Sequence, residues 1–207
     1  MAKLQVYFDY GSPYAYLGWQ RVTRIRPERY KHAEVEWIAA SAGHLFKRDG
    51  SRSNVMMPNQ KRHLVDDVGR WAEHYGIPFA PPADGTPGEM PVYSVDALRL
   101  HIAVADEGEK MERAWMEAVF MAYFRDGADI SDRSVLDGLL DSVGSSVQAA
   151  DADRPELKAR LVANTDAAYL AGAPGVPFTV FEGAGYWGND RLEWVEARLA
   201  RRAPGGT

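Results

Sequence analysis

The sequence predicts an α/β fold in which a long helical insertion separates a β-α-β half from a β-β-α half. Residues 4–8, 34–38 and 178–182 have the apolar or alternating pattern of short strands. Between residues 40 and 163 the strand pattern nearly vanishes and helical patterns follow one another. With 207 residues and 46% apolar composition, the chain can bury one core but is short for two independent domains.

The N-terminal half begins with the strand at residues 4–8. A turn at residues 9–13 follows, and Pro13 suits the first turn of a helix, which we expect over residues 14–25. Residues 34–38 then alternate polar and apolar side chains, as a half-buried second strand does. The order is therefore β-α-β.

The central part is predicted to be helical, with a loop rich in Pro and Gly at residues 78–91. Aromatic side chains recur at helical spacing in it, and we expect them to form core first and a substrate wall second; they are Trp115, Phe120, Tyr123 and Phe124. The expected helices are residues 61–75, 95–107, 111–124, 133–143 and 155–164.

The C-terminal part returns to β structure after a helix that ends near residues 171–172. We expect a strand at 178–182, a turn at 183–185, a short strand at 186–187 and a helix over 190–201. The order matches a thioredoxin-like fold with an inserted all-helical subdomain. Residues 1–45 and 165–207 would form the thioredoxin-like domain and residues 46–164 the insertion.

Composition excludes several classes of function. A net charge of −5 without a long basic run argues against a nucleic-acid partner. No segment has the roughly 18 apolar residues of a membrane span, and the N-terminus lacks a signal peptide, so we expect a cytoplasmic protein. The absence of cysteine excludes disulfide exchange by the chain itself, and the five histidines lack metal-ligand spacing, so no metal site is expected.

Three separate segments would meet where the strand ends face helix N-termini. Ser12 begins the first helix and is either an N-cap, a donor to a bound thiolate, or both. Pro177 is either an ordinary trans strand-entry residue or a cis proline. A cis bond would turn the main chain of Val176 outward to pair with an extended thiol peptide.

The third segment is the turn before the last helix. Asn189 and Asp190 are suited to cap that helix. Alternatively, the free N–H groups of the helix would bind a carboxylate while Asp190 pairs with an ammonium group. The second arrangement fits the head of an amino acid.

These segments resemble the family of 2-hydroxychromene-2-carboxylate isomerases and kappa-class glutathione transferases, within the DsbA-like thioredoxin superfamily. Weaker matches at Phe46-Lys47, Asp67, Arg70-Trp71-Ala72 and Asn164-Thr165 extend the likeness over nearly the whole chain. The main matching segments are Phe8-Asp9-x-x-Ser12-Pro13-Tyr14-x-Tyr16-Leu17, Gly175-Val176-Pro177 and Trp187-Gly188-Asn189-Asp190-Arg191-Leu192.

The resemblance implies a glutathione site, a small aromatic substrate and a homodimer. Ser12 would act on the thiol, and the other residues that would bind glutathione are Val176, Pro177, Trp187, Asn189, Asp190 and Ser51. In the family's isomerase, the thiolate adds reversibly to the double bond of the chromene carboxylate, and glutathione is regenerated as a cofactor. Lys47 and Arg52 are either solvated or steer an anionic substrate.

The chain departs from the family pattern on the substrate side. Ser51 and Tyr93 stand where Asn is common, and Gln60 stands where Lys is frequent. Two other functions therefore stay open besides the isomerase: a kappa-type transferase that consumes glutathione, and a non-catalytic binding protein with a thioredoxin fold. The thiol could be glutathione or another small thiol.

Overall fold

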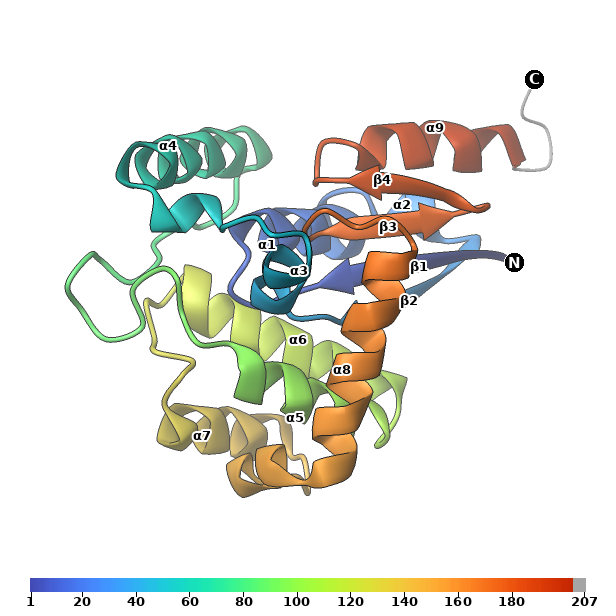
Figure 1. Cartoon of the computed structure of the whole chain (residues 1–207). Coiled ribbons are helices and arrows are strands. Elements are labelled where there is room, and N and C mark those ends of the chain that lie inside the picture. The colour runs from blue at the N-terminus through green and yellow to red at the C-terminus, as the bar shows by residue number, and fades with distance from the viewer. Residues whose placement is uncertain (203–207) are drawn as a thin grey trace.

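The computed structural model describes residues 1–202, whose four strands form one mixed sheet of order β2-β1-β3-β4 (Figure 1). β1 (Ala2–Phe8) lies parallel to β2 (Ala33–Ala39). β3 (Phe178–Phe181) runs antiparallel to β1, and β4 (Ala184–Trp187) completes a hairpin. The predicted thioredoxin-like α/β fold is confirmed.

The first crossover contains one helix more than predicted. α1 (Pro13–Gln20) continues into a π-helical turn, η1 (Arg21–Ile25), so the two together match the expected helix at 14–25. The short α2 (Pro27–Tyr30) follows. In η1 the Thr23 hydroxyl donates to the Trp19 carbonyl at 2.7 Å, a bond back to the preceding turn of the kind that bends helices.

The insertion is helical, as predicted, but its first helix was missed. That helix, α3, has only Leu45 buried, so the sequence carries no apolar stripe there. α8 is one continuous helix where two were expected, on either side of residue 164. The division into domains stays a prediction. Within residues 1–202 no helix is long and apolar enough to cross a bilayer. The elements are α3 (Ala42–Arg48), η2 (Asn54–Met56), α4 (Pro58–Tyr75), α5 (Val95–Ala105), α6 (Glu109–Phe124), α7 (Arg133–Val143), η3 (Ala149–Asp153) and α8 (Pro155–Leu170).

The predicted hairpin turn at residues 183–185 was misplaced. Glu182 and Gly183 form the two-residue turn, with φ of 53° and 74°, and residues 184–185 already belong to β4. Positive φ at both positions is what a tight hairpin of this twist needs. A glutamate rarely adopts it, so the sequence did not mark the turn. α9 (Leu192–Arg202) follows β4.

The sheet is covered on both faces. Leu4 and Phe181 pack with residues of η1, α2 and α9 on one face. Tyr7 and Phe178 pack with residues of α3 and α8 on the other. Figure 1 shows α9 on one side of the sheet and the inserted helices on the opposite side, with α4 projecting beside α1.

The insertion and the sheet share one aromatic core. Trp19 of α1 lies 5.4 Å from Phe120 of α6 between ring centroids, and Tyr16 lies 4.9 Å from Phe124. Phe8, at the end of β1, belongs to the same cluster. The four aromatics that the sequence assigned to the core, Trp115, Phe120, Tyr123 and Phe124, are all fully buried.

A buried ion pair joins the first crossover to the last helix. Arg21 donates to Glu196 through Nε at 2.6 Å and Nη2 at 2.9 Å, and the Tyr30 hydroxyl donates to the same carboxylate at 3.0 Å. Burial alone lowers the pKa of Arg21, but its hydrogen bonds to Glu196 and Tyr75 outweigh burial and hold that pKa above its usual value. The guanidinium therefore stays charged.

We expect Glu196→Ala to lower the free energy of unfolding by about 3 kcal/mol, because the buried Arg21 charge then keeps only Tyr75 and the longer 3.5 Å contact to Glu193. Urea unfolding followed by circular dichroism measures the change. The control is Glu109→Ala, which breaks the exposed pair with Arg113 on α6 and should cost less than about 1 kcal/mol. Equal losses in the two variants would contradict the role of the buried pair.

Candidate active site

A cavity of about 820 Å³ lies where the segments singled out in the sequence meet. It is bounded by the turn after β1, by α3 and the segment after it, by the loop before α5, and by the turn after β4. Six of the seven predicted site residues line it: Ser12, Ser51, Val176, Trp187, Asn189 and Asp190. Pro177 does not line the cavity.

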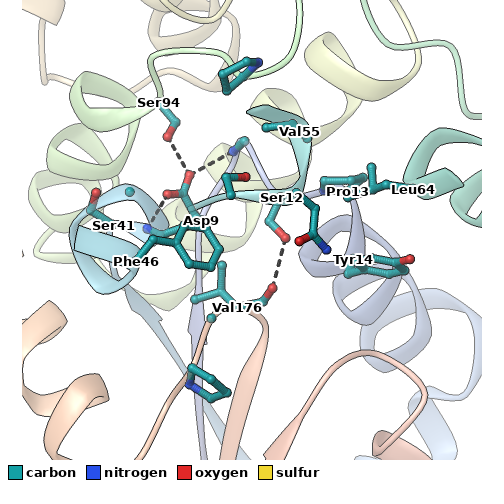
Figure 2. A pocket seen from close by; sticks show the side chains of 18 of the residues that line it. Asp9, Ser12, Pro13, Tyr14, Ser41, Phe46, Val55, Leu64, Ser94 and Val176 are labelled. Atoms are coloured by element: carbon teal, nitrogen blue, oxygen red, sulfur yellow. Dashed lines mark hydrogen bonds between the residues drawn. The ribbon is translucent and has the colours of Figure 1, made fainter. Parts of the chain in front are cut away.

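Ser12 caps α1 and also faces the cavity (Figure 2). Its oxygen accepts a hydrogen bond from the Ala15 N–H at 3.2 Å, so the N-cap interpretation is confirmed. The hydroxyl proton is donated to the carbonyl oxygen of Val176 at 3.1 Å. The two segments, 164 residues apart, are thus joined directly at the cavity wall.

The bond between Val176 and Pro177 is cis, the second of the two alternatives that the sequence left open. The Pro177 carbonyl accepts from the Gly188 N–H at 2.9 Å. A Cβ on Gly18 of α1 would lie 3.6 Å from Pro177 Cγ and 3.9 Å from Asn189 Cβ. The proline loop and the turn after β4 therefore both lie within van der Waals range of α1 at this position.

Asn189 has a buried amide group without a partner. Only 2% of the residue is exposed, and Nδ2 makes no hydrogen bond in the described chain. An unsatisfied buried donor costs about 1–3 kcal/mol. Because Asn189 lines the cavity, a ligand that brings an acceptor oxygen would remove this cost.

The remaining predicted residues are held less firmly. The Asp190 carboxylate, about two-fifths exposed, pairs with the neighbouring Arg191 at 2.5 Å. Trp187 is 54% exposed. Its indole Nε1 would lie 3.2 Å from a Cβ on Gly175, which explains the glycine there. Ser51 is exposed, and its hydroxyl makes a long contact of 3.4 Å to the Phe46 carbonyl.

Asp9 is a site residue to which the sequence analysis assigned no role. Its Oδ1 accepts from the Gly11 N–H at 2.9 Å and from the Ser94 hydroxyl at 2.5 Å. Its Oδ2 accepts from the Ala42 N–H at 2.8 Å (Figure 2). Burial raises the pKa of the Asp9 carboxyl, and these hydrogen bonds oppose the rise. Its position directly after β1 was the feature of the sequence that could have indicated a role at the site.

A second missed interaction joins α1 to α4. The Tyr14 hydroxyl donates to Asp67 Oδ2 at 2.8 Å, and both residues line the cavity. Burial, followed by the nearby Asp67 carboxylate, raises the pKa of Tyr14 well above its usual value. Tyr14 therefore stays a neutral donor at physiological pH, and it holds Asp67 at the cavity edge.

The cavity also carries positive side chains from α3 and the segment after it, Lys47 and Arg52. They give one part of the lining the charge that an anionic ligand would need. Among residues 1–202, no group of three or more His, Asp or Glu side chains could hold a metal ion.

Comparison with known proteins identifies the family. A family model described as a DsbA-like thioredoxin domain matches residues 3–200. The chain belongs to this family. DsbA-like relatives include glutathione S-transferase kappa 1 of Homo sapiens, which is 24% identical over 209 residues, 96% of this chain and 91% of the relative. The 2-hydroxychromene-2-carboxylate isomerase of Pseudomonas putida is 26% identical over 94% of this chain and 93% of its own length.

A solved structure shows the same DsbA-like fold. A structure of 2-hydroxychromene-2-carboxylate isomerase matches with a TM-score of 0.82 at 24% identity and covers 97% of both chains. The resemblance stated from the motifs is therefore confirmed. The named relatives are isomerases and glutathione transferases, which makes this chain similar to enzymes that act with or on small molecules.

We expect Ser12→Ala to lower the free energy of unfolding by about 1 kcal/mol, because α1 loses its N-cap. Denaturant unfolding measures this change. Ser142→Ala removes an exposed hydroxyl near the end of α7 and should change stability by less than about 0.5 kcal/mol. An unchanged Ser12→Ala protein would show that the cap contributes little.

Proposed function

We propose that this protein is a glutathione-dependent isomerase that acts on 2-hydroxychromene-2-carboxylate or a related aromatic intermediate by reversible thiolate addition. The observation that carries the proposal is the buried, unpartnered Nδ2 of Asn189 in the same cavity as Ser12. An amide donor without a partner on one lining residue and a helix-capping hydroxyl on another would suit a ligand that carries both an acceptor and a thiol.

The γ-glutamyl end of glutathione fits the turn after β4. Its carboxylate would accept from Asn189 Nδ2, which satisfies the orphaned donor. Its ammonium group would compete with Arg191 for the Asp190 carboxylate, which is accessible at the cavity edge. Trp187 would cover the peptide, and the main chain of Val176 would pair with the cysteinyl unit.

Ser12 is proposed to stabilise the thiolate. Its hydroxyl has one proton, which it gives to Val176 in the described structure, so donation to a thiolate exchanges one acceptor for the other. The Ala15 N–H keeps the oxygen in place during the exchange. Lowering a thiol pKa by about 2 from about 8.5 takes roughly 2.7 kcal/mol, which a charge-assisted hydrogen bond and a helix N-terminus can supply.

Glutathione, when bound, would supply a thiolate nucleophile for reversible addition to the electron-poor double bond, and it would be regenerated with the trans product. The chain's own residues bind and orient. Lys47 and Arg52 would attract the carboxylate of the substrate. Ser51 and Pro177 are proposed as supports, Ser51 at the exposed edge and Pro177 beneath Val176.

A kappa-type transferase is the second candidate, favoured by the similarity to the human transferase over 96% of this chain. It would use the same thiol site but retain the adduct. The mass of the product separates the two functions, since the isomerase returns free glutathione. A non-catalytic binding protein would bind glutathione without turnover.

The cytoplasmic location and the homodimer stay predictions.

Calorimetric titration with reduced glutathione at neutral pH tests the thiol site. We expect micromolar to low-millimolar binding, and we expect Asp190→Ala to abolish it. Asp141→Ala, which removes an exposed carboxylate of α7, is the matched control and should bind normally. Asn189→Leu should lose affinity without losing stability, because it removes the unsatisfied donor. Absence of binding to the unaltered protein would refute the proposal.

Ser12→Ala tests the chemical role of the hydroxyl. We expect turnover to fall at least about 100-fold while glutathione affinity changes little, because the pKa of the bound thiol rises. Ultraviolet titration of the bound thiolate measures that pKa directly. Asp132→Ala removes the N-cap of α7, far along the chain, and controls for lost stability. Unchanged turnover in Ser12→Ala would remove Ser12 from the mechanism.

A further inference from the structure

We propose that Tyr93 determines acceptor specificity, by offering its ring as a stacking surface for a planar aromatic acceptor in the cavity. The proposal rests on the proposed function, since it concerns the acceptor half of the same site. Tyr93 lines the cavity and is 55% exposed, as is Trp187 of the same lining at 54%, so its ring is accessible to a ligand.

The backbone on both sides of Tyr93 is anchored to the turn that ends at Ser12. On one side, the buried Ser94 donates its hydroxyl to Asp9 at 2.5 Å. On the other side, Val92 lies against Gly11 of the turn, so close that a Cβ added to Gly11 would lie 3.3 Å from Val92 Cγ1. The loop that carries the ring is therefore held against the turn that leads into Ser12.

The rest of the lining suits a planar acid. Val55, Val92 and Trp71 give apolar surface around the same cavity. Lys47 and Arg52 give positive charge, which Asp49 of the same segment partly offsets. A flexible aliphatic acid would gain binding free energy from the two cations alone. An aromatic acid would gain from the cations and also from stacking on Tyr93. The ring would thus make the cavity bind planar acceptors more tightly than non-planar acceptors of equal charge and similar size.

The Tyr93 side chain could act through its ring or through its hydroxyl, and two substitutions separate these effects. Tyr93→Phe keeps the ring and removes the hydroxyl. Tyr93→Leu keeps an apolar side chain and removes the ring. Because Tyr93 is exposed, neither change opens a hole in the core, and glutathione titration of each variant shows whether the thiol half remains intact.

The probes are 2-naphthoate and its saturated, non-planar counterpart decahydro-2-naphthoate, titrated calorimetrically into the protein with and without S-methylglutathione. We expect Tyr93→Leu to weaken 2-naphthoate binding about 3- to 10-fold, the size of one aromatic contact, and to leave the saturated acid unchanged. Tyr93→Phe should bind both acids within about 2-fold of the unaltered protein. Trp194→Leu, an exposed aromatic of α9 outside the cavity, should have no effect.

Equal weakening of both acids by Tyr93→Leu, or no weakening of either, would overturn the proposal, as would failure of the unaltered protein to bind 2-naphthoate. A loss in Tyr93→Phe equal to that in Tyr93→Leu would overturn it in favour of the hydroxyl. These outcomes are independent of glutathione binding. If glutathione does not bind but 2-naphthoate discriminates as expected, the proposed thiol function fails while Tyr93 keeps its role.

Discussion

The buried carboxylate of Asp9 is the constraint on which the cavity depends. It accepts hydrogen bonds from the turn before α1, from the start of α3 and from the loop before α5. The first segment follows β1, the second follows β2, and the third lies well inside the insertion. Burying a carboxylate is costly unless donors surround it, so the three segments must stay together for Asp9 to remain buried. One side chain thereby fixes three walls of the cavity.

The opposite wall depends on small residues rather than on charge. Gly18 of α1 lies within ordinary packing distance of Pro177 and Asn189. Gly188 has φ of 103°, and a Cβ there would lie 2.7 Å from Asp190 Oδ1, so a larger residue would displace that carboxylate. Close approach of the backbone thus shapes the cavity wall at the turn after β4.

The sequence predicted the parts of this arrangement that leave a local pattern. Strand alternation, helix periodicity and the turn before α1 located the sheet and most helices, and the topology then brought Ser12, Val176 and Asn189 to one cavity. α3 was missed because it buries a single side chain. The bonds of Asp9 to Ala42 and Ser94 join residues 33 and 85 positions apart. No local spacing indicates such bonds, and only the folded chain reveals them.

The aromatic core shared by α1, β1 and α6 has a consequence for how ligands enter. Rings from both parts of the chain pack together, with centroid distances of 4.9 Å for Tyr16–Phe124 and 5.4 Å for Trp19–Phe120. Separating the insertion from the sheet as a rigid body would expose these rings to water, at a cost of several kcal/mol. Hinge opening is therefore disfavoured, and we expect ligands to reach the cavity without separation of the two parts. In hydrogen exchange, the amides of the core helices should open together with those of the sheet, in one cooperative unit.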